Sequence, residues 1–182
     1  AEQNPEEWWD AVCLAVKEAL QKGEISSSQI AGVGIDGQSW SAIAVDKDGN
    51  VLTNTPIWMD TRATKEAEYL TAHFDKKDII NKVGFDGIYA IHPVSKILAV
   101  KNKNPEIFEK TRMFAQIKDY FIYRLTGEYY TDHSTASDHG FFDITNRCYW
   151  NEMLEFTGIK EEYLPKLVEP GTELGTISRE AA

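Results

Sequence analysis

The sequence predicts an α/β fold in one domain that spans residues 1–182. Several segments carry apolar residues at helical spacing, short apolar runs end at Gly and Asp turn signals, and the two kinds of segment alternate along the chain. The composition, 42% hydrophobic and 26% charged residues, is that of a globular protein, and no repeat or low-complexity stretch divides the chain.

The first predicted helix begins at Pro5 and ends before Gly23. Asn4 supplies a side-chain acceptor for the free amides of the first turn, and Pro5 suits the first helical position. Glu7 stands where a capping box has its acidic residue. Apolar residues recur at helical spacing and predict one buried face: Trp9, Val12, Val16, Ala19 and Leu20.

Two strands and a hairpin turn are predicted next. Residues 30–38 form an apolar run that indicates a buried strand, with its glycines packed closely against neighbouring segments. Residues 41–46 alternate like a second strand, and Asp46-Lys-Asp-Gly-Asn50 is typical of a hairpin turn. The glycine spacing in residues 32–37 matches a dinucleotide-binding fingerprint, but no helix opens behind it, so we reject that interpretation.

Helical patterns fill most of the remaining chain. They are predicted at residues 60–83 in two pieces that break near 74–75, at 93–102, from 105, at 118–125 before Gly127, near 151–156 and at 160–167. A strand is predicted at residues 113–115, residues 128–140 are polar, and residues 141–144 return to an apolar character.

Charge and cysteine usage exclude several classes of function. The formal net charge is −10, and such an acidic chain repels nucleic acid and anionic membrane surfaces. No apolar run approaches the roughly 18 residues of a membrane span. Cys13 and Cys148 have no metal-ligand spacing. We therefore expect a reduced, cytoplasmic protein with no metal site, no nucleic-acid partner and no membrane partner.

Two segments carry the residues that suit a polyol site. The first predicted strand ends in Gln38, Ser39 and Trp40, and a second strand end presents Trp58, followed by Asp60 and Arg62 on the first turn of a helix. Amide, carboxylate and guanidinium groups bond sugar hydroxyls, and an aromatic face covers the C–H side of a sugar. The alternative is that both tryptophans are core residues and the charged pair caps a helix. Residue types alone do not decide between the two.

A succession of motifs resembles the FGGY family of carbohydrate kinases, and within it the xylulokinases most. The motifs are Glu-Glu-Trp-Trp at residues 6–9, the apolar run at 30–38, the hairpin at 45–52, Ile-Trp-Met-Asp-Thr-Arg at 57–62, His-Pro-Val-Ser-Lys-Ile-Leu at 92–98, the segment 114–127, and Thr-Asp-His-Ser-Thr-Ala-Ser at 131–137. Their order along most of the chain makes the resemblance specific.

The resemblance implies a ribonuclease H-like (actin-like ATPase) fold, with this chain as part of the N-terminal sugar-binding domain, incomplete at both ends and without the C-terminal ATP-binding domain. The family transfers the γ-phosphoryl group of ATP, with Mg²⁺, to a sugar hydroxyl. It implies a small ketose or polyol as substrate, similar to xylulose, and is compatible with a homodimer of the full-length protein. The catalytic base is expected beyond Ala182, so no catalytic residue lies in this chain.

The resemblance also implies site residues. By the matching motifs Gln38, Ser39, Trp40 and Trp58 line the sugar site. Asp60 and Arg62 are expected as further members of the site, with the alternative that they only brace the loop. This chain departs from the xylulokinases where they read Gln-Met-His-Gly, because Trp40 replaces the His. Ala99 and Ile91 also differ from the family signature.

The sequence is also compatible with two other functions, a stand-alone sugar-binding or regulatory module and a purely structural domain. The implied loss of the strands that would pair with residues 30–38 leaves an exposed apolar edge. We therefore expect the isolated chain to associate or to be marginally stable. A monodisperse monomer with a sharp melt at high temperature would contradict this expectation.

Overall fold

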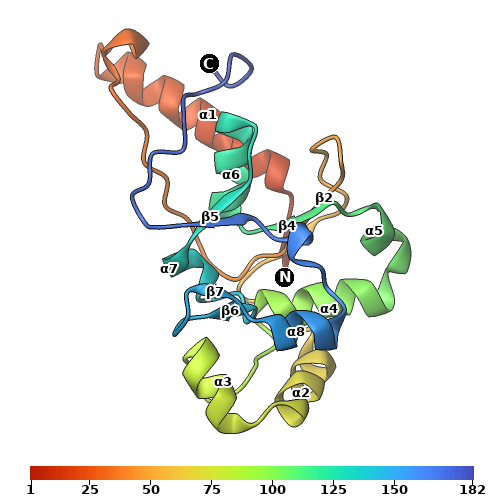
Figure 1. Cartoon of the computed structure of the whole chain (residues 1–182). Helices are drawn as coiled ribbons and strands as arrows, with labels where there is room; N and C mark the ends of the chain where they lie inside the picture. Colours follow the sequence, from red (N-terminus) through yellow and green to blue (C-terminus); the bar gives the residue numbers. More distant parts are fainter.

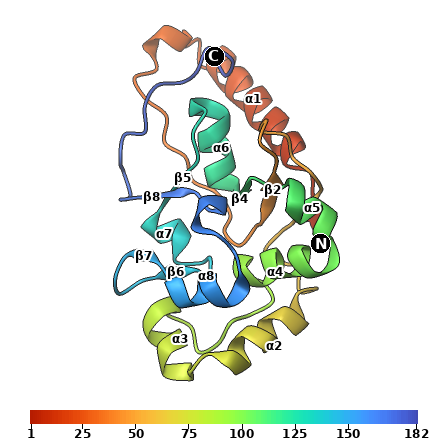
Figure 2. The same cartoon turned by 45° about the vertical axis from the view of Figure 1, so that its right-hand side comes forward.

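The computed structural model describes residues 1–182 as a mixture of helices and short strand pairs (Figures 1 and 2). The helices are α1 (Pro5–Lys22), α2 (Thr64–His73), α3 (Lys76–Val83), α4 (Pro93–Lys103), α5 (Pro105–Lys110), α6 (Ile117–Thr126), α7 (His133–Ala136) and α8 (Asn151–Thr157), with 3-10 turns at Ser27–Gln29 and Glu161–Tyr163. None of the helices combines the length and the apolar character that crossing a membrane requires.

The strands form four separate pairs. The antiparallel pairs are β1 (Glu2–Gln3) with β3 (Thr55–Pro56), β2 (Ile43–Val45) with β4 (Met113–Ala115), and β6 (Phe142–Asp143) with β7 (Cys148–Tyr149). The parallel pair is β5 (Tyr130–Asp132) with β8 (Lys166–Val168).

The β2–β4 pair lies at the centre of the molecule and separates two hydrophobic clusters (Figure 2). Side chains alternate across a strand, so neighbouring residues face opposite sides. Ala44 and Phe114 therefore join a 17-residue cluster with α2, α3, α4 and α8. Ile43 and Ala115 join a five-residue cluster with Tyr120 of α6. Because both faces are buried, the ends of β2 and β4 are held firmly in place.

The predicted strand at residues 30–38 is wrong. This segment is an irregular chain that runs from the end of α1 down to the centre of the molecule (Figure 1). Ile30 is 45% exposed and Val33 is 56% exposed, and Gly32 and Gly34 have no heavy atom within 4 Å of an added Cβ. A strand needs a neighbour to accept its hydrogen bonds, and no other part of residues 1–182 pairs with this one.

The helix predicted before Gly23 is confirmed, but its buried face is not. The Asn4 side chain accepts a hydrogen bond from Glu6 N (3.0 Å), as expected of an N-cap. Trp9 is anchored by the guanidinium of Arg124, 4.6 Å from its ring centroid. Val12 and Val16, however, are 39% and 52% exposed, because no other segment of the chain covers that side of α1.

Most other predicted elements are confirmed. The break between α2 and α3 lies at Phe74–Asp75, where Asp75 caps α3 through a 2.7 Å bond from Lys77 N. The predicted helix at 160–167 is wrong, since only a 3-10 turn forms before β8. The polar stretch 128–140 forms β5 and α7, which local patterns did not indicate.

A buried carboxylate ties α3 to β6. Asp143 is 2% exposed and accepts hydrogen bonds from Lys82 Nζ (2.8 Å) and from the main-chain amides of Thr145 and Asn146 (3.0 Å each). Burial alone would raise the pKa of this carboxyl, but the bonds from Lys82 and Asn146 outweigh it and lower the pKa to about 2. The ionised form is therefore the one that stabilises the fold.

Asp143→Asn is expected to lower the free energy of unfolding at neutral pH by about 2 kcal/mol. Because the folded pKa lies below the unfolded value of about 4, the wild-type advantage is complete above that pH and is lost as the pH falls toward about 2. Urea unfolding of both proteins at neutral and acidic pH measures the difference. A gap of the same size at both pH values would contradict the assignment.

Candidate functional site

The Trp40 loop, residues 37–41, leads directly into β2 and has a strained backbone. Trp40 has a φ of 68°, in the left-handed region that bulky residues rarely adopt. Such a conformation costs on the order of 1–2 kcal/mol and persists only where the surroundings enforce it.

Three hydrogen bonds hold the Trp40 loop. Trp40 N donates to Oε1 of Gln116 (2.5 Å), and the Trp40 carbonyl accepts from Nζ of Lys96. Ile117 N donates to the Ser41 hydroxyl (3.1 Å). Gln116 and Ile117 follow β4 directly, so the pairing of β2 with β4 brings these groups together. Both polar groups of the Trp40 main chain are thus bonded to buried side chains.

The Trp58 turn, residues 57–62, follows β3. Its first carbonyl, that of Ile57, accepts a second hydrogen bond from Lys96 Nζ (2.7 Å). Trp58 is 47% exposed and therefore is not a core residue. The structure thus joins the two predicted segments through one lysine, and it leaves the Trp58 indole open to solvent.

Asp60 and Arg62 lie in the turn before α2, which begins at Thr64. The prediction that they stand on the first helical turn is therefore wrong. Asp60 is 2% exposed, and both its oxygens accept from Nε of Arg62 (3.1 and 2.9 Å). The main-chain amide of Arg62 also donates to Oδ1 (3.0 Å). Both acceptor oxygens of Asp60 are occupied, so this pair braces the turn.

Electrostatics agree with the bracing role of Asp60. Burial would raise the pKa of its carboxyl, yet the hydrogen bonds from Arg62 lower that pKa below its usual range. The carboxylate in turn raises the pKa of the Arg62 guanidinium, which also bonds Glu2 Oε1 at 2.6 Å. The guanidinium of Arg62 thus makes its hydrogen bonds to two carboxylates of its own chain, those of Asp60 and Glu2.

Two buried donors beside the loop have no acceptor. His92 Nδ1 accepts from Tyr89 N (3.1 Å), so the ring proton belongs on Nε2, which has no partner. Nε1 of Trp40 is also buried without a partner, and the two rings meet edge to face at 6.3 Å. Burial and the nearby Lys96 lower the pKa of His92 to about 4, so the ring is neutral at pH 7.

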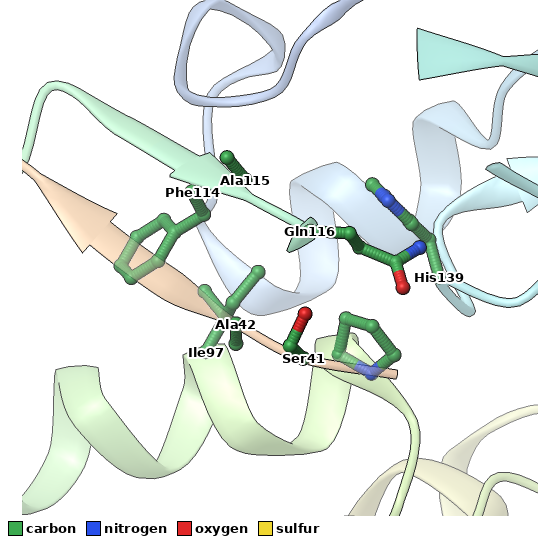
Figure 3. A pocket seen from close by; sticks show the side chains of 8 residues that line it. Ser41, Ala42, Ile97, Phe114, Ala115, Gln116 and His139 are labelled. Atoms are coloured by element: carbon green, nitrogen blue, oxygen red, sulfur yellow. The ribbon is translucent and has the colours of Figure 1, made fainter. Parts of the chain in front are cut away.

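Two hollows adjoin these residues. A pocket between β2, β4 and α4, too narrow for a water molecule, is lined by Ser41, Ala42, Pro93, Ile97, Phe114, Ala115, Gln116 and His139 (Figure 3). It is a packing gap beneath the Trp40 loop. A wider surface groove of about 710 Å³ runs between α2 and residues 86–91, from Thr61 of the Trp58 turn to Ile91 before His92. Of these two hollows, the groove is the one with room for a small molecule, and it adjoins the Trp58 turn at Thr61 without being lined by Trp40 or Trp58.

The structure therefore brings together some predicted residues and adds others. Trp40 and the start of the Trp58 turn are joined, while Gln38 is exposed and Ser39 half-buried in the Trp40 loop. The sequence patterns do not identify Lys96 or Gln116 as site residues. Lys96 lies in the motif at residues 92–98, which was its only signal in the sequence. No group of three His, Cys, Asp or Glu side chains is placed to hold a metal ion.

Comparisons with known proteins place the whole chain in one family. The family model described as "FGGY family of carbohydrate kinases, N-terminal domain" matches residues 1–182. A glycerol kinase of Thermococcus gammatolerans is 34% identical over 98% of this chain and 37% of its own length. A xylulose kinase of Bacillus subtilis is 31% identical over 97% of this chain and 35% of its own length.

Solved structures agree. A gluconate kinase from Lactobacillus acidophilus has a TM-score of 0.90 and 30% identity over 100% of this chain and 36% of its own. A Plasmodium falciparum glycerol kinase solved with ADP has a TM-score of 0.89 and 26% identity over 99% of this chain and 37% of its own. The chain thus spans little more than a third of the proteins it matches.

The left-handed backbone at Trp40 can be tested by substitution. Trp40→Gly is expected to be more stable than Trp40→Ala by about 1 kcal/mol, because only glycine adopts a left-handed backbone without cost. Urea unfolding of the two variants measures the difference. If Trp40→Ala were the more stable of the two, the loop would not hold the conformation described.

Proposed function

The chain belongs to the FGGY family of carbohydrate kinases, and on that premise we propose that it is part of an enzyme that phosphorylates a hydroxyl of a small ketose or polyol. Family membership also confirms the predicted fold class, an α/β N-terminal domain of the actin-like ATPase type. We propose that residues 1–182 contribute to the sugar pocket. We assign the ATP-binding domain and the catalytic base to other parts of the complete protein.

One observation supports the sugar pocket most directly, the common attachment of the Trp40 loop and the Trp58 turn to Lys96. The half-exposed indole of Trp58 is suited to cover the C–H face of a sugar. Gln38 and Ser39 bring an amide and a hydroxyl to the same loop and would bond sugar hydroxyls. Asp60 and Arg62 would hold the turn in place by pairing with each other, and neither side chain would bind the substrate.

The relatives do not single out xylulose. Named glycerol, xylulose and gluconate kinases all align with nearly the whole chain at similar identity. We propose a xylulose-like substrate first, since the motif at residues 57–62 resembles xylulokinases.

The residues of this chain do not fit Mg²⁺ and ATP. The glycines of residues 32–37 lie in an irregular, exposed segment with no helix N-terminus behind them to bind phosphate. No acidic cluster is placed to hold a cation. In the proposed reaction this chain therefore binds and orients the sugar, and the phosphoryl donor is held elsewhere.

The test is a coupled assay of ATP consumption by the complete protein with D-xylulose, glycerol and D-gluconate as substrates. We expect saturable activity with at least one of them. No activity with any of the three would remove the support for a kinase acting on this substrate class and favour a binding or regulatory module.

Trp58→Ala is expected to raise the KM for the accepted sugar by about 10-fold or more, because one stacked aromatic contributes about 1–2 kcal/mol to binding. Its melting temperature should change little, since the side chain is half-exposed. Tyr69→Ala is the matched control, because it removes an aromatic side chain of similar exposure from α2. Equal KM values for Trp58→Ala and wild type would contradict the role of Trp58.

A further inference from the structure

We propose that Lys96 is a positioning residue that fastens the Trp40 loop to the Trp58 turn and so holds the two segments of the proposed sugar site in one arrangement. The fastening itself rests on geometry. Its consequence for the sugar rests on the proposed function.

Lys96 is a buried side chain that hydrogen-bonds two separate segments of the chain. Lys96 lies on α4 and is 2% exposed. Its ammonium donates to the carbonyl of Trp40 and, at 2.7 Å, to the carbonyl of Ile57. These two segments extend from different strand pairs, β2–β4 and β1–β3. The lysine therefore connects them directly where the sheets do not.

Burying an ammonium group in a core position costs free energy, because the charge loses its hydration. Its neighbours on α4, Val94 and Ile97, fill theirs with apolar side chains. Neither hydrogen bond of Lys96 goes to a carboxylate, and the influence of Asp60 on it is through space. Burial lowers the pKa of Lys96 to about 8, which leaves the charged form predominant at neutral pH. Carbonyls of both segments are thus satisfied by one charged donor.

The link also accounts for the strained backbone. Trp40 keeps a left-handed φ of 68° although nothing about tryptophan favours it. With its carbonyl bonded to Lys96 and its amide to Gln116, the peptide groups on both sides of Trp40 are fixed. Loss of the lysine bond frees one of them, and the loop is then able to relax to a negative φ.

Lys101 offers a matched control on the same helix. It also donates to main-chain carbonyls, those of Thr157 (2.6 Å) and Gly158 (3.4 Å) at the end of α8. Lys101→Met therefore removes the same chemistry from α4 without touching the Trp40 loop or the Trp58 turn.

The first experiment is a thermal double-mutant cycle in the complete protein and needs no substrate. Trp40→Gly should melt about 2 °C above Trp40→Ala when residue 96 is lysine, because glycine relieves the left-handed strain. In the Lys96→Met background we expect this difference to vanish, and in the Lys101→Met background to remain. A difference that persists in the Lys96→Met background overturns the proposal.

The second experiment is steady-state kinetics with whichever of D-xylulose, glycerol and D-gluconate the wild type accepts. Misplaced tryptophans should raise the KM of Lys96→Met by about 10-fold or more. A lysine that only stabilises the fold would instead lower the amount of active enzyme and leave KM unchanged. An unchanged KM in Lys96→Met therefore overturns the positioning role. Lys101→Met should keep the wild-type KM.

The two experiments separate the possible failures. If the wild type accepts none of the three substrates, the proposed function fails, and the thermal cycle alone decides whether Lys96 holds the loop. If Lys96→Met does not fold, Lys96→Gln, which keeps a shorter polar head, replaces it in both experiments with the same criteria.

Discussion

A three-residue antiparallel ladder, β2 with β4, is the constraint on which both the fold and the candidate site depend. Both faces of the ladder are buried, one against the cluster around α4 and α8 and the other against Tyr120 of α6. Its register pairs Ile43 with Ala115, and just beyond this end of the ladder Ile117 N donates to the Ser41 hydroxyl. The site loop is thus an extension of the most deeply buried part of the molecule.

A strained backbone, at Trp40, and a buried charge, at Lys96, lie next to each other at this end of the ladder. A left-handed Trp40 and a buried Lys96 ammonium each cost free energy when taken alone. Together they are compatible, since the ammonium satisfies the Trp40 carbonyl that the unusual backbone turns toward it. Such rigid support under exposed side chains is what a binding site requires, because it limits the conformations that a ligand must select.

The exposed part of the chain contrasts with this rigid centre. Residues 30–38 and the outer face of α1 carry apolar side chains that nothing in residues 1–182 covers. Their patterns are those of a strand and of an amphipathic helix, yet only the helix forms. A helix satisfies its own backbone, whereas a strand depends on a partner, and this difference explains why one prediction was confirmed and the other was wrong.

The sequence by itself determined the elements whose signals are local. Asn4 and Gly23 mark the ends of α1, and Asp46 organises its turn through bonds to amides two and four residues on. It also singled out Trp40 and Trp58 by residue type. Only the tertiary structure decided that Lys96 and Gln116 support them, because those hydrogen bonds join residues 56, 39 and 76 positions apart. Contacts at such separations depend on how the whole chain packs, and no local pattern encodes them.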